Sequence, residues 1–170
     1  MLNKNISWKI INLSPVIFLY FFSISEIDTH FENFFEILSF NIQLIIIYFW
    51  VLKNPSVLGN GHIFFAGLIN DVILGFPLGL SSLTYLVISL VATYVKNMSV
   101  HTTLTSDWFT FLVGLIISNS VFLLLISNFS EINISFTEIS YNTFFTLLFF
   151  PFFWFLFSYF NSIMSTQKNV

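Results

Sequence analysis

The sequence predicts an all-α integral membrane protein of six transmembrane helices, and three observations lead to this prediction. First, the chain has 170 residues, of which 56% are hydrophobic and only 8% are charged, with a mean hydropathy of +0.89. A soluble domain carries about 25% charged residues, so this chain has too few to cover a water-facing surface. The second observation is the length of the apolar segments, and the third is the placement of the lysines.

Six apolar segments are long enough to cross a bilayer. A transmembrane helix needs about 20 mostly apolar residues, and at least about 17, to span roughly 30 Å of hydrocarbon. The expected helices cover residues 9–27, 37–53, 57–76, 79–95, 108–128 and 142–163. Transmembrane β-barrels are built from alternating segments of about ten residues, and these continuous runs are too long for that. The loops are short, so residues 1–170 form one predicted transmembrane domain.

The lysines all fall on one side of the membrane when every segment is counted as a span. They are Lys4, Lys9, Lys53, Lys96 and Lys168. The positive-inside rule makes that side cytoplasmic, which predicts that both termini lie in the cytoplasm. Among the acidic residues outside the spans, Asp107 alone joins the lysines, and the rest fall in outer loops. Dropping any one helix would scatter the lysines over both faces, so the charge pattern independently supports six spans.

Several classes of chemistry find no support in the chain. Cysteine is absent, which excludes disulfides, thiolate metal sites and cysteine nucleophiles. The sequence has no nucleophile elbow, phosphate loop, dinucleotide fingerprint or basic nucleic-acid patch. Its three histidines are spread over both sides of the membrane, and His62 is interpreted as an interfacial, hydrogen-bonded histidine. We therefore expect no enzyme activity, no cofactor, no metal and no nucleic-acid partner, and membrane lipid as the surroundings.

One carboxylate, Asp71, lies inside the third segment. A charged side chain at mid-bilayer costs at least about 2.5–3.5 kcal/mol, so it normally faces protein or water. Gly67, Asp71 and Gly75 recur every four residues and share one helix face, and small residues at that spacing allow close helix packing. We therefore expect Asp71 to face a protein interior. No lysine lies at comparable depth, so burial should favour the neutral acid.

Two roles for Asp71 remain open. It caps or cross-links helices near the tight outer turn from Gly75 to Gly79, or it takes part in binding a partner or ligand. A single acid makes no proton relay. Side chains available to donate a hydrogen bond to it are Asn41, Gln43, Ser81, Ser82, Thr84, Ser118, Asn119 and Ser120. The aromatic run over residues 144–160 is interpreted as a lipid-facing or helix-packing surface, with a docking face for another transmembrane helix as the alternative.

Two motifs stand close together in the third and fourth segments. Residues Gly67 to Asp71 read G-L-I-N-D, and residues Gly75 to Gly79 read G-F-P-L-G with Pro77 at the centre. The combination of G-L-x-x-D with G-x-x-L-G resembles the pattern of the MreD family, the bacterial rod-shape-determining membrane proteins. The resemblance is strongest over residues 40–95 and elsewhere extends only to hydropathy. Gly67, Asp71, Gly75, Pro77 and Gly79 are accordingly the predicted partner-binding or helix-packing motif.

The resemblance implies a non-catalytic subunit of the cell-elongation complex in the bacterial inner (plasma) membrane. Such a subunit scaffolds MreC and the peptidoglycan synthesis enzymes and helps to maintain cell shape. The implied partners are MreC, by direct contact, and the actin-like MreB, the glycosyltransferase RodA and its penicillin-binding transpeptidase as members of the complex. The family's fold is also said to be similar to the substrate-binding membrane subunit of energy-coupling-factor transporters. The alternative function is therefore a vitamin-binding transporter subunit. The lack of an alanine-rich contact motif in the first segment and the few polar outer residues argue against it.

Overall fold

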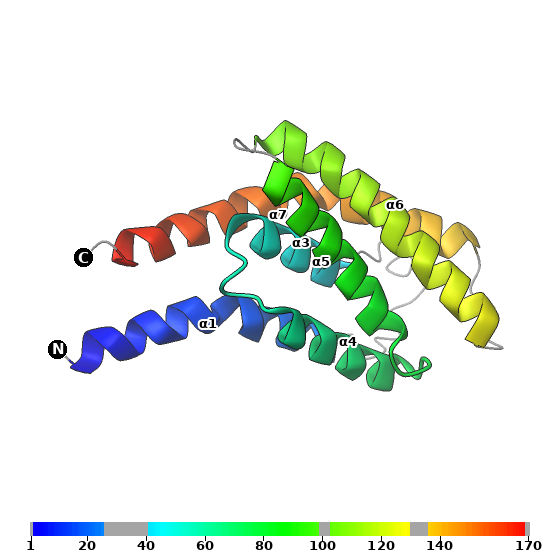
Figure 1. Ribbon diagram of the computed structural model, residues 1–170, viewed down its shortest axis with the longest axis horizontal. Coiled ribbons are helices and arrows are strands. Elements are labelled where there is room, and N and C mark those ends of the chain that lie inside the picture. Colours follow the sequence, from blue (N-terminus) through cyan, green and yellow to red (C-terminus); the bar gives the residue numbers. More distant parts are fainter. Residues whose placement is uncertain (1, 26–40, 99–102, 130–135, 169–170) are drawn as a thin grey trace.

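The protein is described by a computed structural model, which covers residues 2–25, 41–98, 103–129 and 136–168. These residues form six helices and no strand, which confirms the all-α fold (Figure 1). The helices are α1 (Leu2–Ser25), α3 (Ile42–Lys53), α4 (Asn60–Leu74), α5 (Leu80–Met98), α6 (Leu104–Phe129) and α7 (Phe136–Lys168).

Successive helices run in opposite directions, so the ends of the chain lie at the same end of the bundle (Figure 1). Helices α3 and α5 end there, and α4 and α6 begin there. All five lysine positions belong to these helix termini. This end is called the lysine end below, and the other end is called the turn end because it carries the turn between α4 and α5.

Helix α3 is the centre of the bundle. Every residue from Ile42 to Leu52 is buried, and α3 packs against α1, α5 and α7. A helix that is apolar on all sides is expected to be surrounded by other helices. Its 12 residues rise about 18 Å, so α3 alone is shorter than the hydrocarbon core. The first part of the predicted second span, before residue 41, lies outside the described residues.

Two helices of the described chain are long and apolar enough to cross a membrane, namely Leu104–Asn128 within α6 and Phe136–Met164 within α7. Three shorter apolar helices cover Leu13–Ile24, Ile42–Lys53 and Asn60–Leu74. Several helices extend beyond the predicted spans. Helix α1 begins at Leu2 instead of residue 9, and α7 covers Phe136–Lys168 instead of 142–163. A count of apolar residues predicts the part of each helix that fits in the hydrocarbon of a membrane. The helix itself can be longer, because backbone hydrogen bonding continues through the polar residues at its ends.

The aromatic run of α7 divides between two faces. Phe150 is fully buried and stacks on Phe111 of α6, with ring centroids 4.3 Å apart and an interplanar angle of 20°. Phe157 is also buried and packs on α3. Phe152 and Phe155 are more than half exposed. The interpretation of this run as a helix-packing surface is confirmed for its inner face, and its outer face is open apolar surface.

Candidate functional site: the Asp71 turn and the polar cavity

Asp71 organises the turn that joins α4 to α5. It is 0% exposed, which agrees with the predicted interior position. Its Oδ2 accepts a hydrogen bond from the backbone N–H of Gly79 and its Oδ1 accepts one from Ser81, each at 2.8 Å. Its backbone carbonyl also accepts from the N–H groups of Gly75 and Phe76. Four backbone donors therefore converge on one residue.

The two side-chain bonds satisfy donors at the start of α5. The first N–H groups of a helix have no partner within it, and a carboxylate near that end is favourable because the helix dipole is positive there. Asp71 thus acts as an N-terminal cap supplied by the preceding helix, one of the two roles left open by the sequence. Both of its side-chain oxygens act as hydrogen-bond acceptors. The donors are backbone N–H groups and not the side chains that the sequence suggested. Among the residues proposed as side-chain donors, Ser81 forms a hydrogen bond with Asp71, and it does so through its backbone N–H.

Gly67 is the point of closest contact between α4 and α5. A Cβ atom at this position would lie 2.4 Å from Cα and 2.5 Å from the backbone nitrogen of Ser82. The Ser82 hydroxyl donates to the carbonyl of Phe64 at 3.0 Å, across the same contact. The absence of a side chain at Gly67 is therefore what allows the two backbones to meet. The predicted close helix packing at this glycine is confirmed.

Gly75 and Gly79 serve the turn and not the packing. Gly75 ends α4 in the left-handed conformation with φ of +69°, and Gly79 precedes α5 with φ of +99°. Glycine adopts positive φ without the steric cost that a Cβ imposes. No heavy atom lies within 4 Å of a Cβ built at either position, so the expectation that Gly75 belongs to a helix-packing face with Gly67 was wrong. Pro77 lies between them, and its carbonyl accepts from the N–H of Leu80.

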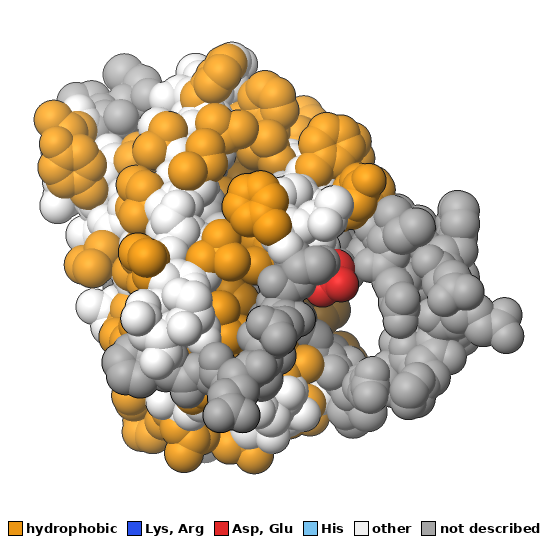
Figure 2. All heavy atoms as spheres, turned by 90° about the vertical axis from the view of Figure 1, so that its right-hand side faces the viewer, with side chains coloured by type: hydrophobic (Ala, Val, Ile, Leu, Met, Phe, Trp, Pro, Cys, Tyr) orange, Lys and Arg blue, Asp and Glu red, His pale blue; other side chains and the backbone are white. Residues whose placement is uncertain are grey.

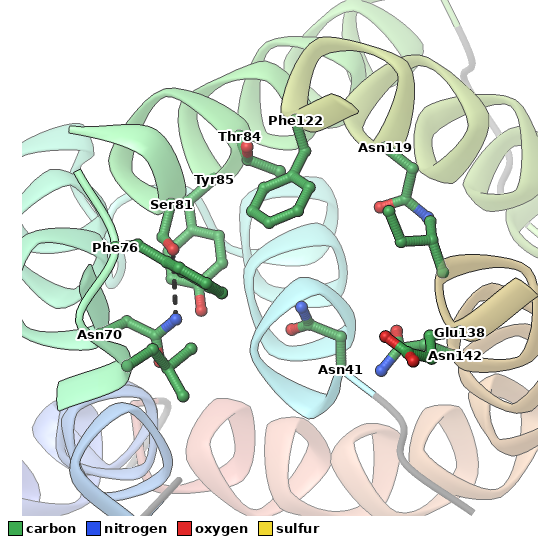
Figure 3. Close-up of a pocket in the computed structure, with 12 residues that line it drawn as sticks. Asn41, Asn70, Phe76, Ser81, Thr84, Tyr85, Asn119, Phe122, Glu138 and Asn142 are labelled. Atoms are coloured by element: carbon green, nitrogen blue, oxygen red, sulfur yellow. Dashed lines mark hydrogen bonds between the residues drawn. The ribbon is translucent and has the colours of Figure 1, made fainter. Parts of the chain in front are cut away.

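A polar cavity of about 220 Å³ opens beside this turn (Figure 3). Four asparagines from different parts of the bundle line it, namely Asn41, Asn70, Asn119 and Asn142. Asn41, Ser81, Thr84 and Asn119 were predicted as donors to Asp71, and the structure places them around this cavity instead. The cavity was not predicted from the sequence, although an asparagine in each of four predicted segments was a visible signal.

A second charged cluster lies at the lysine end of the bundle. Asp107 in the first turn of α6 is 0% exposed, and its Oδ2 lies 2.8 Å from Nζ of Lys53. The indole N–H of Trp154 donates to the same oxygen at 2.9 Å, and the Lys53 ammonium lies 5.5 Å from the centroid of that ring. This cluster joins α3, α6 and α7. The sequence predicted that Asp107 lies on the same side as the lysines, but it did not predict the ion pair with Lys53.

His62 forms the predicted hydrogen bond, between its Nδ1 and the hydroxyl of Tyr20 at 3.3 Å. Within the described residues, no group of three or more His, Asp or Glu side chains could hold a metal ion. Comparison of the chain with protein-family models, with curated proteins and with solved structures finds no match. The assignment to a family therefore stays a prediction from the motif residues.

Proposed function

We propose that this chain is a non-catalytic, multi-pass subunit of the bacterial cell-elongation complex in the inner membrane. In this proposal all six helices cross the bilayer, with the lysine end in the cytoplasm. The subunit binds MreC directly and scaffolds the peptidoglycan synthesis enzymes, with MreB, RodA and its penicillin-binding transpeptidase as further members of the complex.

The observation that carries the proposal is the architecture of the motif from Gly67 to Gly79. The residues that resemble the MreD pattern form one helix–turn–helix unit, in which Asp71 caps the start of α5 and Gly67 permits the contact of α5 with α4. Asp71 has a structural role in this unit, which is consistent with a non-catalytic scaffold protein. The grouping of lysine positions at one end of the bundle supports the topology.

The exposed apolar surface supports a location in the membrane, in contact with lipid or with other helices. Phe144, Phe152, Phe155 and Tyr159 on α7 are each more than half exposed. Exposed apolar area on this scale marks a surface that contacts lipid or another protein. A transmembrane partner such as MreC would contact surface of this kind.

Depletion in the native cell tests the proposal. We expect rods to become round and the recovery of MreC with the membrane to fall, because the scaffold that retains MreC is lost. Re-expression of a Gly61→Ala variant should restore both, whereas an Asp71→Leu variant should restore neither. Cells that keep their rod shape on depletion would contradict the proposal.

A second candidate function is the small-molecule-binding membrane subunit of a transporter. The cavity favours this function, because it brings together polar side chains from helices that are distant in the sequence. This function requires energy-coupling ATPase subunits that copurify with the chain. A stable complex with MreC and without such subunits would exclude it.

A further inference from the structure

The polar cavity and a groove on the outside of the bundle share a wall. The groove has a volume of about 340 Å³ and lies between α6 and α7, where Ile116, Phe136 and Phe144 are each more than half exposed. Asn119 and Ile139 line both the groove and the cavity. These two side chains therefore stand between the two spaces.

The groove faces hydrocarbon if the chain lies in the membrane as proposed above. Its lining residues all belong to Leu104–Asn128 and Phe136–Met164, the two stretches of the described chain that are long and apolar enough to cross a membrane. Figure 2 looks onto the turn end of the bundle, where hydrophobic side chains cover much of the described surface and no lysine or arginine of the described residues is in view. A break in the shared wall would therefore connect the polar cavity with lipid.

A hydrogen bond between Asn119 and Thr143 crosses from α6 to α7 at this wall. Nδ2 of Asn119 donates to the hydroxyl oxygen of Thr143, and that hydroxyl donates to the carbonyl of Ile139 within α7. The hydroxyl proton is thus used inside α7, and the oxygen accepts from the amide. Hydrogen bonds between transmembrane helices add little stability on average, so this bond, called the latch below, opens at a small cost.

Helix α7 contains a bending point on the lysine side of the latch. Pro151 lies inside the helix and has no N–H to donate to the carbonyl of Leu147, four residues earlier. The indole N–H of Trp108 on α6 donates to that carbonyl instead, at 3.0 Å, and the N–H of Asn41 donates to the neighbouring Thr146 at 2.9 Å. Proline is a usual cause of bending in a helix, and a neighbouring helix can satisfy the carbonyl that it frees. These two bonds fix a pivot, about which the preceding part of α7 can swing.

We propose that residues 136–145 of α7 form a side gate, which pivots near Leu147 and opens the polar cavity to the lipid. In the closed state, which the structure shows, the latch between Asn119 and Thr143 holds the gate against α6. In the open state the groove and the cavity join. A small uncharged molecule, the class that dissolves in hydrocarbon, then reaches the cavity sideways from the bilayer.

This inference rests on the membrane location given in the proposed function, and it is independent of the part in cell elongation. Depletion of the chain reads cell shape and the recovery of MreC. The labelling experiment below reads the gate in the purified chain, so the two tests fail separately.

Labelling of a single cysteine tests the gate. The chain has no native cysteine, so Thr84→Cys places one thiol on the cavity wall. The full chain in lipid nanodiscs is treated with N-dodecylmaleimide, which partitions into lipid, or with a sulfonated maleimide, which stays in water, and mass spectrometry gives the labelling rates. Thr143→Val removes the acceptor of the latch and should raise the rate with the lipid-soluble reagent by about three-fold to about 20-fold. The rate with the sulfonated reagent should not change.

Two further variants complete the test. Thr93→Val is the matched control, because the Thr93 hydroxyl on α5 also donates to a carbonyl of its own helix, that of Ser89, and it should leave both rates unchanged. Pro151→Ala supplies a backbone donor for the Leu147 carbonyl and should slow labelling from the lipid, which keeps the proposal testable where Thr143→Val fails to fold.

Four results would overturn the proposal. They are no labelling of the cavity thiol from the lipid, faster labelling by both reagents in Thr143→Val, an equal effect of Thr93→Val, and a rate in Pro151→Ala at or above that of the parent.

Discussion

Gly67→Ala tests the contact on which the α4–α5 unit depends. The added Cβ would lie 2.4 Å from Cα of Ser82, whereas ordinary contacts begin at 3.4 Å. The two helices would have to separate by about 1 Å, because the opposing atoms are backbone and cannot rotate away. Overpacking of this kind costs about 1–3 kcal/mol.

Gly61→Ala is a matched control in the same helix. No heavy atom lies within 4 Å of a Cβ built at Gly61, so this substitution adds the same methyl group without a clash. Both variants gain the helix propensity of alanine over glycine, which is at most about 1 kcal/mol. The difference between them therefore isolates the steric effect, and Gly67→Ala should be the less stable of the two by about 1–3 kcal/mol.

The measurement is the free energy of unfolding of each purified variant in mixed micelles, titrated with a denaturing detergent and followed by tryptophan fluorescence. Thermal aggregation of the same samples gives an independent ranking. If Gly67→Ala is as stable as Gly61→Ala, or more stable, then α4 and α5 do not meet at this glycine and the packing argument fails.

Substitutions at Asp71, Gly75 and Asp107 address the turn and the buried ion pair by the same unfolding assay. Asp71→Asn should destabilise less than Asp71→Leu, because asparagine keeps one acceptor for the N–H groups of Gly79 and Ser81. Leucine leaves both donors unpaired, which costs about 1–3 kcal/mol for the buried N–H of Ser81 and less for the part-buried N–H of Gly79. Equal losses would contradict the two-acceptor geometry. Gly75→Ala should cost about 1–2 kcal/mol because its φ is positive. Gly61→Ala, where φ is not positive and a Cβ meets no atom within 4 Å, should not destabilise. A neutral Gly75→Ala would refute the left-handed cap. Asp107→Ala should cost roughly 2–4 kcal/mol, less than a fully buried ion pair because the ammonium partner is 18% exposed. In that background Trp154→Phe should cost less than in the wild type, since its acceptor is already gone, and additive losses in a double-mutant cycle would show that the two residues are not coupled.

Much of the fold could be predicted because its signals are local. Each helix corresponds to one long apolar segment, and the turn between α4 and α5 is marked by Gly75, Pro77 and Gly79 within five residues. The burial of Asp71 also follows from its neighbours in the sequence, because an acid in an apolar segment must face protein or water. The four-residue spacing predicted the close helix packing at Gly67 correctly, but it did not apply to Gly75. Helix α4 ends before Gly75, so its packed face does not extend to that residue.

The amino-acid sequence by itself determined the all-α class, the six helices of the described residues, the grouping of lysine positions at one end and the turn that carries Asp71. Only the tertiary structure decided that the acid binds N–H groups at the start of α5, that Lys53 meets Asp107, and that Asn70 and Asn119 face one cavity. Hydrophobicity and turn chemistry act within a few consecutive residues, so a linear pattern records them. Contacts between helices depend on how each helix is rotated and how closely it packs, and those quantities are set by all of its neighbours together.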